Sequence, residues 1–517
     1  MVTAGFLQQD LIWNLTSDSA GDFAAPGSCG NLSVLQFVKS KRLRHSHLDL
    51  KNSFCTPPPP NFRRIWTAFL LGALFLISAG AARAGMWTTG YYPGWEQAGM
   101  PASNIDYTAL THIIHFSVVP NSDGSLDSDA NTITTENSND LVARAHAAGL
   151  KVLICVGGGG TESLFQGATS TANLPVFINN LTNFMALRGY DGVDIDWEPF
   201  PSTDALLYTN LIYGLRTALN KFPQPKLITV AAGAYPPYGD SPTGEYTIYA
   251  AIQNQLDQIN IMTYDLSGPY DGWVTWFNSP LYDGGFRFPS SGGLVPSVNG
   301  SVTNFLGNGV SAGKLAISAA FYGDVWTGGT GSSASSITQP RQGWSNAPSL
   351  TSYRYSDIIA DYYQPGLYHW DTNAQAAYLS ITNANPLNNA FISYDDPRTC
   401  QAKVSYARNH LLGGIMIWEL AQDHTPGSPD PLLQAVKQAL ATPGAISLQR
   451  AGQDIDLTFA DCSLGAYRVL WNNNLSSGLW NTLLITNISG LGGMLQLRDP
   501  GAVTNQPARF YRVQTPP

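Results

Sequence analysis

The segment YDGVDIDWEPF, residues 190–200, places an acidic side chain at three alternate positions, Asp194, Asp196 and Glu198. The residues between them are β-branched or aromatic, which favours a β-strand. Because successive side chains of a strand point to opposite faces, the three acids share one face, with neighbours roughly 7 Å apart along the chain. Stacked carboxyl groups are costly as structure, so the segment indicates a site where acids share protons.

The competing interpretation of these acids is a strand held by salt bridges. No basic residue occurs between Arg188 and Arg216, so the segment itself supplies no partner for such bridges. Clustered carboxyl groups with perturbed pKa values are typical of functional sites. We therefore interpret the three acids as chemical groups.

Eight short apolar segments follow one another from Gly85 onward, with amphipathic stretches between several of them. In the stretch 205–219 a leucine recurs at every fourth position, which predicts a helix. Near-continuous apolar strands that alternate with helices are typical of a parallel sheet buried on both faces. Eight such units in about 350 residues favour an α/β fold, a closed (β/α)8 TIM barrel with insertions. The predicted strands are GMWTTGYY (85–92), THIIHFSV (111–118), KVLICVGG (151–158), GVDIDW (192–197), KLITVAA (226–232), QINIMTYD (258–265), KLAISAAF (314–321) and GGIMIWEL (413–420).

Polar residues gather at the carboxyl ends of these predicted strands, where the reacting groups of such barrels lie. Glu198 follows the fourth strand, Tyr264 and Asp265 end the sixth, and Trp418 with Glu419 ends the eighth. The glycines from Gly157 to Gly160 follow the third strand, where small residues allow a ligand or another strand to approach closely. The sequence thus predicts one polar site at the mouth of the barrel.

Five ordered motifs resemble glycoside hydrolase family 18, the chitinase and endo-N-acetylglucosaminidase family. YDGVDIDWE resembles the signature of that family, and the resemblance extends over roughly residues 85–440, the whole predicted barrel. The supporting motifs are TTGYYPGW at the first strand, LTHIIHF at the second, KVLICVGG at the third, INIMTYD at the sixth, and FISYDDPRTCQAKVSYARNHLLGGIMIWELAQD (391–423) at the last helix and strand. The resemblance implies a barrel enzyme that acts on N-acetylglucosamine polymers.

The resemblance also implies a substrate-assisted reaction, an exception among glycosidases that use two enzyme carboxyl groups. Glu198 matches the acid that protonates the leaving oxygen, and Asp196 matches the carboxylate that grips the acetamide N–H of the substrate. Asp194 would lie deeper and share a proton with Asp196. Tyr264 would hydrogen-bond the acetamide oxygen.

Five further residues are implied as substrate-binding groups. Tyr91 matches the tyrosine that supports the innermost aspartate, Met262 lines the pocket, and Asp265 contacts the −1 sugar. Trp418 matches the tryptophan on which that sugar stacks. Tyr270 stands where many relatives have tryptophan, so stacking there is reduced but retained. Core packing is the alternative explanation for Tyr91, Tyr264 and Trp418.

The chain departs from the family pattern at the third strand. Cys155 replaces the usual serine, and a thiol is a weaker hydrogen-bond donor, which puts its hydrogen bond to Asp194 in question. Gly159 stands where a tryptophan commonly follows, so we expect a weaker +1 sugar site. These differences affect leaving-group binding more than the acid itself.

The long segment 321–395, between strands seven and eight, resembles the small α+β insertion of many family members. Trp344, Trp370 and Tyr394 within it are candidates for sugar contacts, although core positions in the insertion explain them equally well. Such an insertion forms one wall of a deep groove, which favours chitin oligomers as substrate.

Residues 445–517 alternate apolar and polar side chains with frequent turn signals, which predicts a C-terminal all-β module of the sandwich type. Pro443-Gly444 marks the end of the linker before it. A spacer, a carbohydrate-binding module and a sorting signal are all open interpretations, and the spacer is favoured because no aromatic platform is visible.

Residues 61–84 have the layout of a secretory signal. Arg63 and Arg64 precede a short apolar run, and small residues follow up to a cleavage site after Ala84. We expect a secreted protein, extracellular or periplasmic, with no stable membrane insertion after cleavage; an uncleaved anchor is the alternative. The upstream segment 1–60 suggests a start codon assigned too early.

Composition excludes several classes of function. A net charge of −9 and a pI of about 5.3 argue against a nucleic-acid partner. The five cysteines contain no Cys-x-x-Cys pair, and His112 and His115 lie three apart on a strand, on opposite faces, so no metal site is expected. No cofactor is expected, and we expect a monomer.

The sequence as a whole favours a secreted chitinase that cleaves by a retaining mechanism through an oxazolinium intermediate. The first alternative is an endo-N-acetylglucosaminidase that acts on the chitobiose core of N-glycans. The second is a chitin-binding, lectin-like barrel without activity, which the presence of Glu198 disfavours.

Overall fold

The computed structural model describes residues 13–16 and 86–514, except for 235–243, 330–336, 442–446, 462–464, 474–479, 489–492 and 504–507. The predicted signal segment 61–84, nearly all of the upstream segment 1–60 and the linker at Pro443-Gly444 therefore lie outside the described residues. Strand β1 (Trp13–Thr16) is the described part of the upstream segment.

The main body is a closed barrel of eight parallel strands, as predicted. Strand β2 pairs with both β15 and β3, and the order β2-β15-β9-β8-β7-β6-β5-β3 closes the ring. Strand β4 (Leu126–Asp127) adds to β3 in antiparallel orientation outside this ring. The barrel strands are β2 (Trp87–Pro93), β3 (His112–Pro120), β5 (Lys151–Gly158), β6 (Gly192–Trp197), β7 (Leu227–Gly233), β8 (Gln258–Met262), β9 (Leu315–Ala320) and β15 (Gly414–Trp418).

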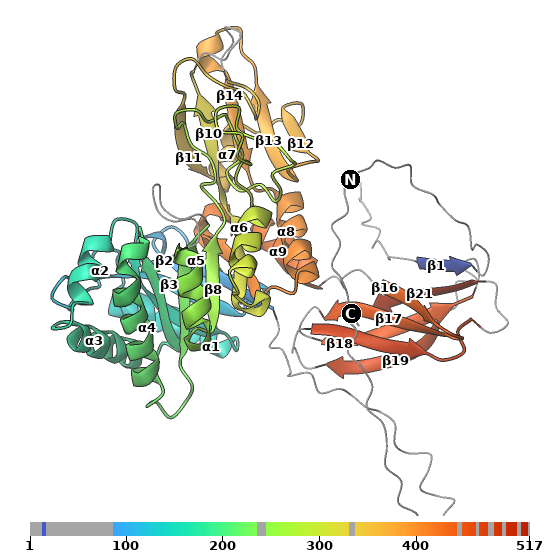
Figure 1. The fold of residues 1–517 in the computed structure, drawn as a ribbon, viewed down its shortest axis with the longest axis horizontal. Helices are drawn as coiled ribbons and strands as arrows, with labels where there is room; N and C mark the ends of the chain where they lie inside the picture. The colour runs from blue at the N-terminus through green and yellow to red at the C-terminus, as the bar shows by residue number, and fades with distance from the viewer. Residues whose placement is uncertain are drawn as a thin grey trace, which may run out of the picture. The chain divides into compact units, whose positions relative to one another are not determined.

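Helices follow the strands and cover the barrel, because each strand must bury its outer face as well as its inner one. Figure 1 shows α1, α3 and α4 outside the strands. Helix α4 spans the predicted 205–219 and buries the leucine stripe, including Leu211, Leu215 and Leu219, in the barrel core. The helices of the barrel are α1 (Thr135–Ala147), α2 (Glu162–Ala168), α3 (Leu174–Leu187), α4 (Ala205–Leu219), α5 (Gly244–Ile252), α6 (Val298–Gly307), α8 (Pro397–Asn409) and α9 (Pro431–Ala441).

The predicted α+β insertion lies between barrel strands β9 and β15. It is an antiparallel sheet of order β11-β10-β14-β13-β12 with the short helix α7 (Tyr355–Asp361), and Figure 1 shows these strands together. Its strands are β10 (Tyr322–Thr327), β11 (Ser349–Arg354), β12 (Tyr368–Asp371), β13 (Ala376–Ile381) and β14 (Ala390–Tyr394). The insertion therefore leaves the barrel at the carboxyl end of β9 and returns through α8.

A buried ion pair joins the insertion to the barrel. Lys403 of α8 contacts Asp395, directly after β14, at 2.5 Å, and both side chains are almost fully buried. The other contacts are hydrogen bonds: Lys403 Nζ donates to Ser279 Oγ, and the Ala320 backbone N–H donates to Asp395. The pair thus ties α8, the end of β9 and the loop after β8 to the end of the insertion, directly after β14.

The predicted C-terminal all-β module consists of two antiparallel sheets, one of order β16-β17-β20 and the other containing β21-β18-β19. Apolar residues from both sheets, including Ile455, Val469 and Tyr511, form one core, which is the arrangement of a β-sandwich. The strands are β16 (Ser447–Ala451), β17 (Asp454–Asp461), β18 (Gly465–Asn472), β19 (Asn481–Ile488), β20 (Gly493–Asp499) and β21 (Ala508–Gln514).

His112 and His115 serve packing and hydrogen bonding, as predicted. His112 stacks on Trp87, with 3.6 Å between ring centroids, and His115 Nδ1 lies 2.7 Å from the Tyr190 hydroxyl. Burial lowers the pKa of each histidine to about 3, so both are neutral. Within the described part of the chain we find no group of residues suited to a metal ion and no helix long and apolar enough for a membrane span.

Replacement of Lys403 by Ala should destabilise the protein by about 3 to 5 kcal/mol, because Asp395 would remain buried without a cation. Urea unfolding of the full chain, followed by circular dichroism, measures this loss. Arg144→Ala removes an exposed ion pair with Asp140 and serves as the control, with no measurable change expected. Equal stability of Lys403→Ala and the parent protein would contradict a junction held by this pair.

Candidate active site

The three acids of the opening segment lie on β6 or directly after it, and two of them point into the barrel. Asp194 and Asp196 are buried, and Glu198 is partly buried at the mouth. The alternating residues Val193, Ile195 and Trp197 belong to the core on the other face of β6. The period of two in the strand therefore separates the acids from the apolar side chains, as predicted.

Asp194 is held by side chains from three other strands of the barrel, β2, β5 and β7. The Tyr91 hydroxyl donates to Oδ2 at 3.0 Å, and the Thr229 hydroxyl donates to Oδ1 at 2.5 Å. Burial raises the pKa of Asp194 to about 6, and hydrogen bonds from Thr229, Tyr91 and the Cys155 thiol limit this rise. The thiol thus does act as a hydrogen-bond partner of Asp194. Thr229 was not anticipated, because a lone threonine on an apolar strand carries no signal of its own.

Asp196 forms a hydrogen bond with Glu198, which the sequence analysis did not name, and the proton shared with Asp194 stays a prediction. Each oxygen of Asp194 accepts one hydroxyl hydrogen bond. Burial, then the charges of Glu198 and Asp194, raises the pKa of Asp196 well above its ordinary value. Burial is also the largest cause of the raised pKa of Glu198. Asp196 and Glu198 therefore share one proton, and Asp196 Oδ1 has no partner among the described residues.

Tyr264 and Asp265 lie beyond β8, which ends at Met262, three residues earlier than predicted. The pKa of the Tyr264 hydroxyl is raised, first by burial and then by the nearby charges of Glu198 and Asp196. Asp265 has a left-handed backbone, with φ of 54°, and its N–H donates to Asn278 Oδ1 at 2.7 Å. This turn ends the strand and directs the Asp265 carboxyl group toward the Tyr322 hydroxyl, which donates to it.

Tyr322 and Asn278 were also missed by the sequence analysis. They lie 57 and 13 residues from Asp265 in sequence, and they contact it through the insertion and the loop after β8. The Tyr322 ring packs edge-on against Tyr264, with centroids 5.8 Å apart. Neither residue belongs to a motif that could have identified it.

Trp418 ends β15 and forms the aromatic floor of the site. The centroid of its ring lies 5.6 Å from that of Tyr91, with the two rings tilted. It lies 4.8 Å from that of Phe116, in an edge-on arrangement. Trp418, Met262 and Tyr264 are partly buried and pack against one apolar cluster inside the barrel. The structure therefore brings Tyr91, Met262, Tyr264 and Trp418 together with the acids.

Tyr270 is not part of this cluster. It is 59% exposed and packs edge-on against Trp273 at 5.0 Å, so it is accessible on the loop after β8. Among the insertion candidates, Tyr394 is buried in the core, so its prediction as a sugar contact was wrong. The guanidinium carbon of Arg398 lies 3.9 Å from the centroid of the Trp370 ring, and the Trp344 ring packs against Trp326. Each of these two tryptophans therefore has a packing partner within the protein.

Gly157 shows why the third strand ends in glycine. A Cβ atom there would lie 2.0 Å from the Asp196 carbonyl oxygen, and φ is 112°. The prediction of a close approach is thus confirmed, and the approaching group is the neighbouring strand β6. Only glycine allows β5 to lie this close to the acid-bearing strand.

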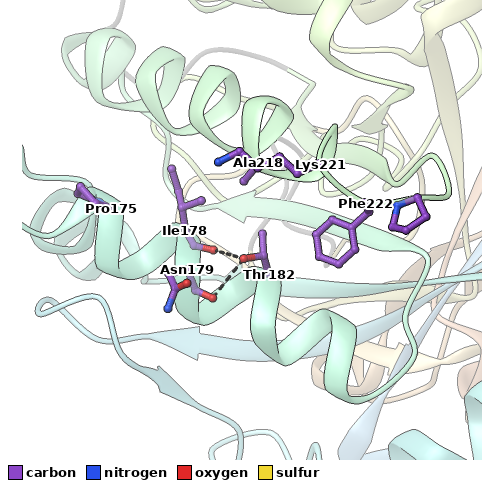
Figure 2. Close-up of a pocket in the computed structure, with 8 residues that line it drawn as sticks. Pro175, Ile178, Asn179, Thr182, Ala218, Lys221 and Phe222 are labelled. Atoms are coloured by element: carbon purple, nitrogen blue, oxygen red, sulfur yellow. Dashed lines mark hydrogen bonds between the residues drawn. The ribbon is translucent and has the colours of Figure 1, made fainter.

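A separate pocket of about 440 Å³ lies on the outside of the barrel, along α3 and near the end of α4 (Figure 2). The Thr182 hydroxyl that lines it donates to the Ile178 and Asn179 carbonyl oxygens, so its polar group is satisfied internally. No acidic residue lines this pocket, and it contains none of the predicted site residues. The predicted site residues therefore lie elsewhere, at the barrel mouth.

Comparison with known proteins gives consistent matches over the barrel. The sequence model of the family described as Glycosyl hydrolases family 18 matches residues 88–423. The chain is 31% identical over 323 residues to Chitinase A1 of Niallia circulans, which corresponds to 57% of this chain and 43% of that protein. It is 28% identical over 382 residues to Chitotriosidase-1 of Mus musculus, 68% of this chain and 78% of that protein. The chain thus spans less than half the length of the bacterial relative.

The fold has close counterparts among solved structures. The crystal structure of Ostrinia furnacalis Group IV chitinase in complex with allosamidin superposes with a TM-score of 0.58 at 22% identity. That match covers 69% of this chain and 99% of the other. A family 18 N-acetylglucosaminidase from Paenibacillus barengoltzii gives a TM-score of 0.57 at 24% identity, over 68% and 99% of the two chains. At this level of identity the likeness concerns the fold.

Replacement of Asp194 by Asn should change how stability depends on pH. The folded pKa of Asp194 is raised from 3.8 to about 6, so the folded protein binds more protons than the unfolded chain within this window. The free energy of unfolding therefore falls as pH rises through the window. Between about pH 4 and pH 8 this fall should be smaller in the variant by about 2 to 3 kcal/mol. Urea unfolding at both pH values tests this, and an equal fall in both proteins would contradict a burial-raised pKa.

Proposed function

This chain belongs to glycosyl hydrolases family 18, and from that premise we propose that it hydrolyses β-1,4-linked N-acetylglucosamine polymers, namely chitin or its oligosaccharides. The observation that carries the proposal is the geometry of the barrel mouth, where the buried Asp194 and Asp196 and the partly buried Glu198 lie together on β6 and directly after it. The relatives named above as chitinases support the substrate class.

Glu198 is the general acid of the proposed reaction. Burial raises its pKa, and the charge of Asp265 raises it further, so the group keeps a proton at pH values where an exposed glutamate would lose it. The proton passes to the glycosidic oxygen as the bond from that oxygen to C1 breaks. The freed hydroxyl group leaves with the +1 sugar.

The nucleophile is the carbonyl oxygen of the substrate's own 2-acetamido group, which forms a bond to C1 as the leaving group departs. Asp196 accepts the acetamide N–H, for which its unpartnered Oδ1 is suited, and the Tyr264 hydroxyl donates to the acetamide oxygen. The product of this step is a cyclic oxazolinium ion, and the negative charge of Asp196 balances it. Water then attacks C1, Glu198 takes its proton, and the configuration at C1 is retained.

The remaining residues hold this arrangement in place. Asp194 is the innermost of the three acids. Hydrogen bonds from Tyr91, Cys155 and Thr229 hold its carboxyl group in position. Trp418 offers an apolar face for the −1 sugar, and Met262 lines the same space. Asp265 contacts the −1 sugar, and the exposed Tyr270 stacks farther along the chain.

Two alternatives concern the same site. An endo-N-acetylglucosaminidase would use the same acids on the chitobiose core of N-glycans, and a lectin-like barrel would bind without cleavage. The insertion, which supplies Tyr322 to the site, favours an extended groove and hence chitin oligomers. The raised pKa of Glu198 suits a general acid, which a barrel that only binds chitin does not need, and this disfavours the lectin-like alternative.

We also propose that residues 61–84 direct export, that cleavage after Ala84 follows, and that the protein acts as a monomer outside the cytoplasm. The proposal is supported by the paired arginines, the apolar run and the small residues before Gly85. Residues 445–517 act as an accessory module, with a spacer role favoured.

Replacement of Glu198 by Gln should lower kcat on N-acetylglucosamine oligomers at least about a hundredfold, with little change in binding, because the shape is kept and the transferable proton is lost. The measurement compares parent and variant on chitin oligomers and on a high-mannose glycopeptide. Cleavage of the oligomers by the parent alone supports the proposed function. Cleavage of the glycopeptide in preference to the oligomers would establish the endo-N-acetylglucosaminidase instead, and undiminished turnover by the variant would refute the role of Glu198.

A further inference from the structure

Two buried polar residues support the backbone segment that carries Tyr264. That segment, residues 263–266, directly follows barrel strand β8. Asn278 and Ser279, later in the same loop, contact it, and only 1% and 4% of their surfaces are exposed. We refer to Asn278 and Ser279 as the clamp.

Three hydrogen bonds join the clamp to this segment. The Ser279 hydroxyl donates to the Thr263 carbonyl oxygen. The Asp265 backbone N–H donates to Asn278 Oδ1 at 2.7 Å, and the Leu266 N–H donates to the Asn278 carbonyl oxygen at 2.9 Å. The clamp thus holds the segment through side-chain and main-chain groups together.

Two of these bonds lie on either side of Tyr264. The Thr263 carbonyl group belongs to the peptide unit before Tyr264, and the Asp265 N–H belongs to the peptide unit after it. Because each peptide unit is planar, the orientations of these two planes set φ and ψ of the residue between them. Ser279 therefore holds the first plane and Asn278 the second.

The plane after Tyr264 needs such support. Asp265 has φ of 54°, a left-handed conformation that is uncommon for a residue with a side chain. Such a conformation persists where the surrounding structure holds it. The hydrogen bond from the Asp265 N–H to Asn278 Oδ1 is one contact that does so.

The direction of the Tyr264 ring follows from this backbone and from packing. The Tyr322 ring packs edge-on against it, with centroids 5.8 Å apart, and Tyr264 also packs against the apolar cluster inside the barrel. The phenolic oxygen lies at the far end of the ring. A small rotation at the Tyr264 Cα atom therefore moves the hydroxyl through a larger distance.

The clamp is itself held by elements outside the β8 loop. Lys403 Nζ, on helix α8, donates to Ser279 Oγ at 2.5 Å. The Asn278 backbone N–H donates to Ser393 Oγ, on insertion strand β14, at 2.8 Å. The clamp thus connects the backbone around Tyr264 to α8 and to the sheet of the insertion.

We propose that Asn278 and Ser279 are positioning residues, which orient the Tyr264 hydroxyl toward the acetamide oxygen of the −1 sugar. The inference rests on the proposed function and adds the residues that act through Tyr264. Both clamp residues are buried, so they act through the peptide planes and not on the substrate itself. The hydroxyl stabilises charge that develops in the transition state, so its displacement should lower kcat more than it changes KM.

A double-mutant cycle on the full chain tests whether Ser279 acts through Tyr264. Tyr264→Phe alone should lower kcat on N-acetylglucosamine oligomers about a hundredfold, which leaves a measurable rate. Ser279→Ala should lower kcat about tenfold, with less than about a twofold change in KM. In the Tyr264→Phe background, where the hydroxyl is already absent, Ser279→Ala should lower kcat less than about twofold.

The matched control is Ser301→Ala in helix α6. It also removes a buried hydroxyl that donates to a backbone carbonyl oxygen, and it lies outside the loop after β8. This control should change kcat less than about twofold in either background. A residue that only stabilises the fold would lower kcat by the same factor with and without the Tyr264 hydroxyl.

A pair of variants tests Asn278. Asn278→Asp keeps an oxygen that can accept the Asp265 N–H, whereas Asn278→Leu keeps a similar size without an acceptor. The leucine variant should lower kcat about tenfold or more, and the aspartate variant should lose less. The loss in the leucine variant should also vanish in the Tyr264→Phe background.

The outcomes separate this inference from the proposed function. Equal losses from Ser279→Ala in both backgrounds, an unchanged kcat in that variant or in Tyr264→Phe, or a greater loss in Asn278→Asp than in Asn278→Leu would overturn the positioning role while leaving cleavage by the parent intact. Absence of cleavage by the parent would refute the proposed function. If Ser279→Ala or Asn278→Leu does not fold, the other decides through the same cycle.

Discussion

Three carboxyl groups, two on strand β6 and one directly after it, impose the constraint on which the rest of the site depends. Buried acids that face one another cannot all ionise, so each needs a hydrogen-bond donor or a shared proton. The barrel supplies donors from both neighbours of β6 and from a strand farther around the ring: Cys155 lies on β5, Thr229 on β7 and Tyr91 on β2. These donors fix Asp194 in place. The proton shared by the outer two acids then lies at the mouth, where a substrate can take it.

The second requirement is a wall that stays in place beside these acids. The insertion reaches the site through Tyr322, and the buried contact between Lys403 and Asp395 joins its return to the end of β9. An unpaired charge in such a position is costly, so the pair acts against separation of the insertion from the barrel. The insertion is therefore held to the barrel by a buried contact at this junction. The position of Asp265 depends on this arrangement, since its carboxyl group accepts from the Tyr322 hydroxyl.

The sequence predicted the barrel because each strand is a near-continuous apolar segment, and the bounds of β5 and β6 agree with the prediction residue by residue. It placed the end of β8 too late, since a backbone reversal at Asp265 cannot be read from INIMTYD. The hydrogen bond between Asp196 and Glu198 was not predicted. The contact of Thr229 with Asp194 was not predicted either, because it follows from strand register in the closed barrel. Tyr322 and Asn278 were missed for a similar reason, because only the folded insertion and loop bring them to Asp265.

The central claim is that the buried acids serve a nucleophile carried by the substrate. The most direct measurement compares cleavage rates of three β-1,4-linked oligomers of one length: fully N-acetylated, fully deacetylated, and the glucose oligomer from cellulose. We expect cleavage of the acetylated chain alone, because the other two have no acetamide oxygen to attack C1 and no group for Asp196 and Tyr264 to hold. Comparable cleavage of the glucose oligomer would contradict the account and would make Asp196 the nucleophile.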